Sequence, residues 1–463
     1  MAEPWATLGI DLHLEPTGPG LRRGLTDALR DAVRTGRLAP RTRLPSSRTL
    51  AADLGIARNT VADAYADLVA EGWLTARQGS GTRVADRAVA TPPTAPAPRT
   101  EAPARPAYDL RPGNPDLSSF PRAEWLKAAR RALTAAPHEA LGYGDPRGRP
   151  ELRAALAGYL SRARGVRAHP EHILVSGGFA HALSLLGQAL RSRGVHTVAV
   201  ESYGLDVHRD LLTAAGLRTV PLPYDDLGTD PRAPAGEAGA VLLTPAHQFP
   251  MGLALHPDRR AAVVDWARRT GALVLEDDYD GEFRYDRQPV GALQGLDPDR
   301  VVHLGTASKS LAPGLRLGWA VLPPGFVDEV VAAKGHVDVC GALEQLTLAE
   351  FLTSGAYDRH LRAARLRYRR RRDALVTALA ARAPGTRATG IAAGQHAVLR
   401  LPAGTERSVV RLATWQNIAL YGLARFRHPQ AVLDPLDAVV VGYGTPPDHA
   451  WTGALDALCR VLP

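Results

Sequence analysis

A chain of 463 residues with a hydrophobic content of 45% is long enough to form two or more domains with separate cores. It has two cysteines without metal-ligand spacing and no apolar run of about 18 residues, which excludes a disulfide-rich scaffold, a zinc cluster and a membrane span. The formal net charge is +9, and residues 19–87 alone hold twelve Arg against seven Asp and Glu, so we expect a polyanionic partner near the N-terminus. The first residues lack a basic stretch followed by an apolar one, which favours a protein of the reducing cytoplasm.

The N-terminal module, residues 19–86, is predicted to fold as three helices followed by a β-hairpin. Apolar residues at helical spacing indicate a first helix that ends near Gly36. Ser46 or Ser47 is suited to cap a short second helix that Gly55 stops, and a third helix is expected from about residue 58 to residue 71. With two short strands around a glycine-containing turn, this is the pattern of a winged helix-turn-helix. The helical spacing is that of Leu21, Leu25, Leu29 and Val33, the second helix carries Leu50 and Leu54, and the third is expected to bury Val61, Ala64, Tyr65 and Leu68.

The segment LPSSRTLAADLGIARNTV, residues 44–61, and the EGWL and GSGT motifs after it closely resemble the GntR-family DNA-binding domain. The resemblance covers roughly residues 20–85 and implies binding to double-stranded DNA; the alternative is a winged helix that serves only protein contacts. An arginine at the amino end of a recognition helix offers two donors to guanine, and a threonine and backbone amides bind phosphate. Family members carry arginine where this chain has Asp63, so one contact fewer is expected. The resemblance assigns DNA contacts to Arg48, Arg58, Asn59 and Thr60, and places Gly79 of the wing at the minor groove.

Residues 87–107 form a Pro/Ala tract without aromatic or periodic apolar residues, which predicts an extended, semi-rigid linker. After it, residues 108–463 alternate apolar runs with helical stretches. This alternation predicts an α/β domain with a mostly parallel sheet that helices cover on both faces. Ligands of such sheets bind at the carboxyl ends of the strands, where this chain places polar residues. The expected strands comprise residues 173–175, 197–200, 240–243, 272–275 and 301–304.

Lysine is rare in this chain: only three of its 56 Lys and Arg residues are lysines, at positions 127, 309 and 334. A primary amine forms a Schiff base where a guanidinium cannot, so Lys309 is a candidate for covalent chemistry. Taken alone, it is equally well interpreted as a leftover surface charge. Its neighbours favour the first interpretation, because Ser308 precedes it, Arg316 follows seven residues later, and the acidic segment 276–280 ends a predicted buried strand.

Residues 108–463 resemble the fold-type I aminotransferases, which depend on pyridoxal 5′-phosphate (PLP). The resemblance identifies Lys309 with the Schiff-base lysine and Tyr279 with the residue that hydrogen-bonds the ring oxygen. Asp277 matches the carboxylate that keeps the pyridinium nitrogen protonated, which makes the ring an electron sink. Each residue alone has a plain structural interpretation, such as a helix cap for Asp277, but their joint occurrence in the family's order favours the cofactor site.

The same resemblance implies the remaining cofactor contacts. Backbone N–H groups at a helix amino end would bind the phosphate, as such ends bind anions generally. Ring stacking falls to Tyr203, and Tyr143 would contact the phosphate of a second subunit, which implies a dimer with shared sites. The segment TPAHQFPMG replaces the Asn-Pro loop usual in free aminotransferases, and either His247 or Gln248 lies in the region of the ring-oxygen contact. The residues implied at the phosphate are Gly177, Gly178, Phe179, Ser308 and Arg316.

A GntR-type module, a Pro-rich linker and an aminotransferase-like module in this order resemble the MocR transcriptional regulators, as do the TPAHQFP and EDDYDGEFRY segments. The resemblance implies a PLP-responsive bacterial transcription factor. PLP would form an aldimine with Lys309, and PLP itself, or an amine or amino acid that exchanges onto it, would change DNA binding. A head-to-tail homodimer would favour directly repeated operator half-sites.

The alternative is a working aminotransferase that carries a DNA-binding domain. Turnover of amino acids usually needs an arginine for the substrate carboxylate just before the last conserved strand, and this chain has DAVVVGY there, at residues 437–443. Arg425 or Arg427 is a candidate substitute from a nearby loop, although both are as readily interpreted as solvated charges. The missing arginine favours a sensor. A third class, a large module that has lost PLP and only dimerises, is disfavoured by the intact lysine, aspartate and tyrosine.

Overall fold

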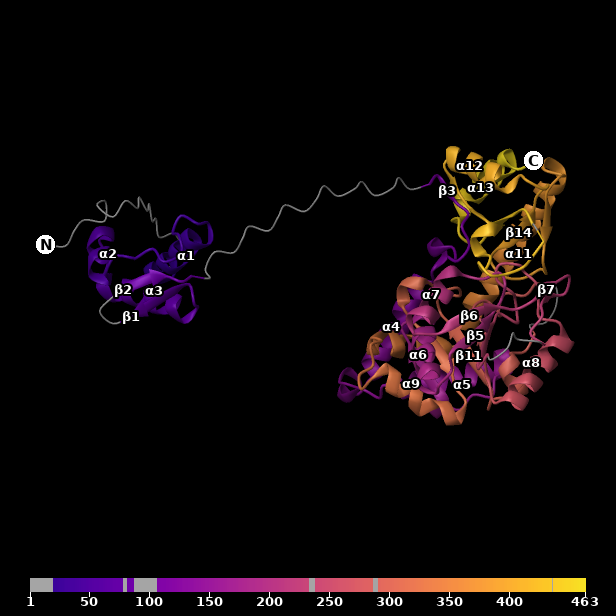
Figure 1. The fold of residues 1–463 in the computed structure, drawn as a ribbon, viewed down its shortest axis with the longest axis horizontal. Coiled ribbons are helices and arrows are strands. Elements are labelled where there is room, and N and C mark those ends of the chain that lie inside the picture. Colours follow the sequence, from indigo (N-terminus) through magenta and orange to yellow (C-terminus); the bar gives the residue numbers. More distant parts are fainter. Residues whose placement is uncertain (1–19, 78–80, 87–105, 233–237, 286–289, 435) are drawn as a thin grey trace. The chain divides into compact units, whose positions relative to one another are not determined.

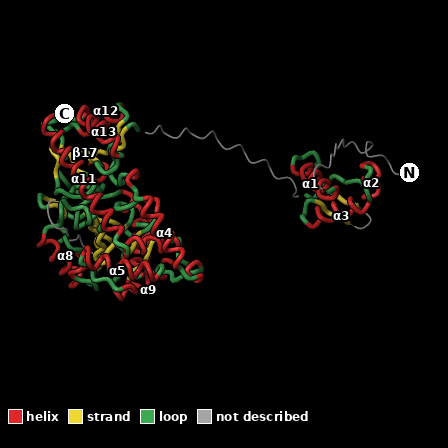
Figure 2. The backbone as a smooth tube through the Cα atoms, turned by 180° about the vertical axis from the view of Figure 1, so that it is seen from behind, coloured by secondary structure: helices red, strands yellow, loops and turns green. Residues whose placement is uncertain are grey.

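The computed structural model describes residues 20–77, 81–86, 106–232, 238–285, 290–434 and 436–463. Contacts divide the chain into two compact units, with the boundary between residues 104 and 105, and each unit is described by itself (Figures 1 and 2). Residues 87–105 of the predicted linker lie outside the described residues, and so does Gly79 of the predicted wing.

The N-terminal unit is a winged helix-turn-helix with one small core. Ser46, rather than Ser47, caps the second helix, because its Oγ accepts a hydrogen bond from the N–H of Thr49 at 3.1 Å. Gly55 ends that helix in the left-handed conformation, at φ 65°. Leu21 is the first residue of its helix and is 57% exposed, so it lies outside the core of this unit. The elements are α1 (Leu21–Arg34), α2 (Ser47–Leu54), α3 (Arg58–Ala70), and β1 (Leu74–Arg77) paired antiparallel with β2 (Gly81–Val84).

The C-terminal unit contains a seven-stranded sheet with the strand order β4-β12-β11-β10-β9-β5-β6. Its strands run parallel except β12, which is antiparallel to both of its neighbours. All five predicted strands are present, so the expectation of a mostly parallel sheet is confirmed. The strands are β4 (Ile173–Ser176), β5 (Thr197–Val200), β6 (Arg218–Pro221), β9 (Ala240–Leu243), β10 (Leu273–Asp277), β11 (Val301–Thr306) and β12 (Gly318–Val321).

Helices cover both faces of this sheet. Successive side chains of a strand point to opposite faces, so apolar residues on each face pack against a different set of helices. In β10, Leu275 packs in one apolar cluster with α6 and α9, whereas Val274 packs in another with α8. Because a strand of this kind is buried on both faces, its sequence is a nearly continuous hydrophobic run. The helices around the sheet are α4 (Arg122–Ala135), α5 (Pro150–Arg164), α6 (Phe179–Ser192), α7 (Asp206–Ala214), α8 (Pro257–Thr270), α9 (Val327–Lys334) and α10 (Ala342–Thr353).

Residues 356–463 contain a second, four-stranded antiparallel sheet with the order β13-β14-β17-β16. Both views show its strands grouped with α11, α12 and α13, apart from the larger sheet (Figures 1 and 2). Within the described residues, we find no helix with the length and apolar character needed to cross a membrane. The elements here are α11 (Ala356–Arg382), β13 (Arg387–Thr389), β14 (Ala397–Arg400), α12 (Glu406–Trp415), β16 (Tyr421–Gly422), β17 (Ala438–Val441) and α13 (Asp448–Val461).

Candidate functional site

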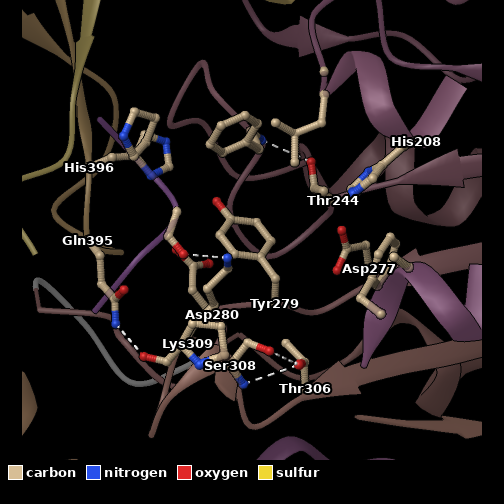
Figure 3. Close-up of a pocket in the computed structure, with 18 of the residues that line it drawn as sticks. His208, Thr244, Asp277, Tyr279, Asp280, Thr306, Ser308, Lys309, Gln395 and His396 are labelled. Carbon is tan, nitrogen blue, oxygen red and sulfur yellow. Dashed lines mark hydrogen bonds between the residues drawn. The ribbon is translucent and has the colours of Figure 1, made fainter. Parts of the chain in front are cut away.

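A cavity of about 290 Å³ opens at the carboxyl ends of β5, β9, β10 and β11. This is the sheet edge at which the sequence predicts a ligand site. Figure 3 shows Asp277, Thr244 and His208 on one side of the cavity and Gln395 and His396 on the other, with Tyr279 and Asp280 between them. The predicted residues that line it are Phe179, Asp277, Tyr279, Ser308, Lys309 and Arg316.

Asp277 is the one carboxylate in its acidic segment that makes no hydrogen bond with the described residues. Glu276 accepts the backbone N–H of Gln294 at 2.9 Å, and Asp278 accepts two hydrogen bonds from Arg164 at 2.7 and 2.8 Å. Asp277 is 5% exposed, and its Oδ1 has no partner. Burial raises the pKa of Asp277 well above its usual value, an effect that the nearby Lys309 opposes. A buried carboxylate of this kind fits a protonated ring nitrogen.

Lys309 presents its amine to the same cavity. Its Nζ donates a hydrogen bond to the carbonyl oxygen of Gly113 at 2.5 Å, and Gln395 Nε2 donates to the Lys309 carbonyl oxygen at 2.6 Å. Burial lowers the pKa of Lys309, against the opposing attraction of Asp277 and Asp280. A lowered pKa increases the fraction of neutral amine, which is the nucleophilic form that attacks a carbonyl carbon.

An anion-binding corner lies where α6 begins. Gly178 is the N-cap of α6, at φ 95°, and the first helical residue, Phe179, lines the cavity. Arg316 lies against this helix end: a Cβ placed on Gly178 would come within 3.4 Å of Arg316 Nη1. The Arg316 side chain forms no hydrogen bond or ion pair with the residues that the structure describes. Its backbone has a φ of 51°, in the left-handed region. A helix amino end, a free guanidinium and the Ser308 side chain together fit a phosphate group.

His247 lies behind Tyr279 and is absent from the described residues that line the cavity. The Tyr279 hydroxyl donates to the carbonyl oxygen of His247 at 3.1 Å and lies 3.1 Å from His247 Nδ1. That nitrogen is also 2.8 Å from Asp280 Oδ2. Burial raises the pKa of Tyr279 well above its usual value, so its phenol stays protonated. His247 therefore orients Tyr279 and does not itself reach the cavity.

The two other predicted aromatic contacts lie elsewhere in this single chain. Tyr203 is buried in an apolar cluster with Phe249 and Phe426, and its ring meets that of Tyr224 edge-on at 5.5 Å. Tyr143 is 95% exposed. Among the described residues, neither aromatic lines the cavity, and the same holds for Gly177 and Gly178.

Several cavity residues escaped the sequence predictions. Glu201 and Thr244 follow β5 and β9 directly, so the rule that polar residues at strand ends bind ligands could have indicated both. Burial raises the pKa of Glu201 to about 7, and Thr244 Oγ1 donates a hydrogen bond to it. No sequence pattern indicated the others, which come from helices and loops distant in sequence. They include Gly113, Asn114, Leu205, His208, Arg209, Gln395 and His396.

The two arginines considered for a ligand carboxylate have partners outside the cavity lining. Arg425 forms an ion pair with Asp206 at 3.3 Å and lies over the ring of Tyr421 at 4.6 Å. Arg427 donates to the carbonyl oxygen of Ala431 at 2.8 Å. Both side chains are exposed, and neither lines the cavity in the described part of the chain.

The N-terminal unit contains arginines that form ion pairs with acids and exposed arginines that form none with the described residues. Those on α1 are paired with acids, for example Arg22 with Asp67 at 2.6 Å and Arg30 with Glu71 at 2.8 Å. Arg48 and Arg58, near the amino ends of α2 and α3, are exposed and form no ion pair with any described residue. Asn59 is exposed beside Arg58, and Thr60 is half-buried. The free donors thus gather at the start of the helix that enters the groove in winged helix-turn-helix proteins.

Fold and sites together define a DNA-binding protein whose second domain has the architecture of a PLP-dependent aminotransferase. The family model described as bacterial regulatory proteins, gntR family, matches residues 21–84, and the model of aminotransferase class I and II matches residues 108–428. Of the solved structures, an archaeal alanine:glyoxylate aminotransferase matches with a TM-score of 0.68 and 25% identity, over 76% of this chain and 90% of that one.

Two curated relatives carry the same pair of domains over most of their length. The HTH-type pyridoxine biosynthesis transcriptional regulator PdxR of Corynebacterium glutamicum is 34% identical over 88% of this chain and 89% of its own. The probable rhizopine catabolism regulatory protein MocR of Rhizobium meliloti is 34% identical over 77% of this chain and 76% of its own. The chain therefore belongs to the MocR subfamily of GntR-type transcriptional regulators, with PLP as the cofactor of its aminotransferase-like domain.

Proposed function

We propose that this regulator holds PLP in the cavity of its C-terminal unit and that the bound cofactor, or an amino compound exchanging onto it, controls DNA binding by the N-terminal unit. The observation that carries the proposal is the free Asp277 carboxylate, which faces the same cavity as the Lys309 amine. A buried acid without a partner is costly to the folded chain, and a protonated ring nitrogen removes that cost.

Each end of the cofactor has matching groups in this chain. Lys309 would bind the aldehyde carbon, Asp277 the ring nitrogen, and Arg316 with the amino end of α6 the phosphate. Tyr279, held by His247, lies between these groups for the ring oxygen. When bound, PLP supplies an electrophilic carbon and an electron sink.

A sensor fits the cavity better than an efficient aminotransferase. The strand β17 and its flanks supply no arginine, and both arginines of the nearby loop are engaged outside the cavity. Without a group that fixes the substrate carboxylate in the reactive geometry, turnover loses the positioning on which its rate depends. We expect single exchange reactions, not sustained transamination.

A homodimer would complete the phosphate site. Tyr143 is almost fully exposed, and a second hollow beside Arg316 is lined by Gly177, Val339 and Gly341. The partner subunit's Tyr143 would enter this hollow and contact the phosphate. Apolar side chains exposed in the same unit support an interface of this kind. They include Leu126, Leu133, Leu141, Val337, Val339 and Leu343.

The dimer would connect the cofactor to DNA. A head-to-tail arrangement presents two winged helices in the same direction, which favours directly repeated half-sites. Ligands shift DNA binding only if they bind the two DNA-binding states with different affinity. We also place the protein in the cytoplasm, where its two free cysteines stay reduced.

Absorbance spectroscopy of the Lys309→Ala variant tests the cofactor assignment. Wild-type protein mixed with PLP should show the visible absorbance of a lysine-bound cofactor, and the variant should show only that of free PLP. Lys127→Ala is the matched control, because that lysine lies on α4 and is absent from the described cavity lining. An unchanged spectrum in the Lys309 variant would rule out the assignment.

A further inference from the structure

Two histidines and one aspartate of the C-terminal unit bring their side chains together beside the cavity. In each of His247, Asp280 and His396, an atom that can bind a metal lies within 4.8 Å of the corresponding atoms of the other two. The three come from separate parts of the chain, after β9, after β10 and directly before β14, and none is more than 5% exposed. The proposed function uses His247 to hold Tyr279 and gives no role to Asp280 or His396.

The ring of His396 is arranged as in a metal-binding histidine. Its Nε2 lies 3.1 Å from the carbonyl oxygen of Pro250, and because a carbonyl only accepts, this nitrogen carries a proton and donates it. In the neutral ring the lone pair is then on Nδ1, which has no hydrogen-bond partner among the described residues. Histidines that bind a metal through one nitrogen commonly donate the other N–H to a backbone carbonyl in this way.

Asp280 has one carboxylate oxygen that the protein leaves without a partner. Its Oδ2 lies 2.8 Å from His247 Nδ1, whereas its Oδ1 is buried and makes no hydrogen bond with the described residues. The neighbouring Asp278, equally buried, accepts two hydrogen bonds from Arg164. A buried carboxylate with an unpaired oxygen is costly to the folded chain, and a bound cation would remove that cost.

The backbone beside this cluster is kept free of a side chain. Gly394 has a φ of 72°, and a Cβ on it would come within 2.5 Å of His247 Nδ1 and within 2.6 Å of Asp280 Oδ2. These distances are shorter than a van der Waals contact, so the approach of the two polar groups depends on glycine at this position. Asp280 and His396 also line the cavity, which gives the cluster an open side (Figure 3).

We propose that His247, Asp280 and His396 bind a divalent transition metal ion of the zinc class, with a further coordination position open to the cavity. Two imidazoles and one carboxylate form a ligand set of zinc sites that keep an open position, and imidazole favours zinc over magnesium or calcium. Ligand atoms of a tetrahedral zinc ion lie about 3.4 Å apart, so small side-chain rotations would close the cluster around the ion. The ion would displace the proton between His247 Nδ1 and Asp280 Oδ2.

This site differs from the cysteine-based zinc cluster that the sequence excludes. Its ligands include no cysteine, and they stand too far apart in the chain to form a spacing motif. The inference does not depend on the proposed function, because the three ligands are present in the protein whether or not PLP is bound.

Isothermal titration of full-length, tag-free protein with zinc chloride tests the proposal. Wild-type protein should bind one zinc ion per chain at this site with a dissociation constant of about 1 μM or below, and magnesium chloride should give no such binding. Asp280→Asn and His396→Gln should each weaken zinc binding roughly 100-fold or more, since each removes a ligand of the ion. Two variants are used so that one remains informative if the other does not fold.

His169→Gln is the matched control. His169 is an exposed histidine whose ring lies 5.4 Å from that of His172, so it represents a histidine pair on the surface. This variant should bind zinc as wild-type protein does. Thermal unfolding without zinc shows whether each variant is folded, and added zinc should raise the melting temperature of wild type and of His169→Gln but not that of Asp280→Asn.

Three results would overturn the proposal: no zinc binding by wild-type protein, wild-type affinity in a folded Asp280→Asn or His396→Gln variant, or loss of binding in His169→Gln. Any of them would leave the three residues as a hydrogen-bonded cluster that positions Tyr279. The titration is made without added PLP, so its failure would not count against the cofactor assignment, and a failure of the spectroscopic test of Lys309 would not count against the metal site.

Discussion

Asp277 and Lys309 stabilise each other's charged forms across the cavity, although burial favours the neutral form of both. The carboxylate raises the pKa of the lysine, and the ammonium lowers the pKa of the acid. The attraction between the two groups does not offset the effect of burial, so the pKa of Asp277 stays raised and that of Lys309 stays lowered. Such a pair suits a ligand that brings an electrophilic carbon to Lys309 and a protonated nitrogen to Asp277.

Replacing Asp277 by Asn should stabilise the cofactor-free protein while weakening PLP binding. The amide removes a buried carboxylate that has no hydrogen-bond partner among the described residues, so we expect unfolding free energy at neutral pH to rise by about 1–3 kcal/mol. It also removes the partner of the ring nitrogen, which should weaken PLP binding roughly tenfold or more. Denaturant unfolding without PLP and a PLP titration measure the two effects, and a variant that binds PLP as well as wild type would contradict the assignment.

Alanine in place of Gly178 should damage the phosphate corner. Gly178 has a φ of 95°, which disfavours any side chain, and the new Cβ would lie in contact with Arg316 Nη1, at 3.4 Å. We expect a loss of stability of about 1–2 kcal/mol and weaker binding of PLP, measured by thermal unfolding and titration.

Gly158→Ala is the matched control for that substitution. Gly158 lies inside α5, and a Cβ there would meet no atom within 4 Å. The change should stabilise the protein by about 0.5–1 kcal/mol, because alanine favours a helix interior. Destabilisation in Gly158→Ala, or none in Gly178→Ala, would count against the geometry described for the site.

Glu201 should make stability depend on pH. Its pKa rises from the ordinary value of 4.5 to about 7 in the folded chain. The folded state therefore binds the proton of Glu201 more tightly than the unfolded state. This proton stabilises the folded state at low pH, and that stabilisation is lost as pH rises from about 4.5 through 7. The expected loss is about 3 kcal/mol. Urea unfolding at a series of pH values should show this decline in wild-type protein and a flatter profile in Glu201→Gln, and equal profiles would contradict the burial described for Glu201.

DNA affinity should depend on Arg58 far more than on Arg34. Arg58 is exposed without an ion pair at the amino end of α3, whereas Arg34 pairs with Asp31 on α1 at 2.8 Å. Arg58→Gln should weaken operator binding by about 1–3 kcal/mol and relax base specificity, and Arg34→Gln should have a much smaller effect. Fluorescence anisotropy with labelled operator DNA measures both, and similar affinities for the two variants would remove the DNA-reading role given to α3.

The sequence predicted the fold because its signals were local. Five buried strands appeared as short apolar runs, and the pair Ser46 and Ser47 with Gly55 indicated the two ends of α2. The residues Asp277 and Lys309 were found because each stands in a short motif at a strand end.

What escaped prediction depends on chain segments that meet only in three dimensions. Arg209 and Gln395 reach the cavity from a helix and from the C-terminal part of the chain, and neither belongs to a motif. The resemblance to aminotransferases predicted that Tyr203 stacks on the ring, yet in this chain its ring packs with Tyr224, while Leu205 and His208 line the wall. Side-chain direction in a loop depends on such tertiary contacts, so spacing alone did not determine it.

Measuring DNA affinity with and without PLP tests the central claim most directly. The labelled operator is titrated with wild-type protein and with Lys309→Ala, each in the presence and absence of excess PLP. If the cofactor at Lys309 sets the DNA-binding state, PLP should change the affinity of wild-type protein by about 5- to 150-fold and leave that of the variant unchanged. Equal affinities of the wild-type protein with and without PLP, or an equal PLP response in the variant, would contradict the claim.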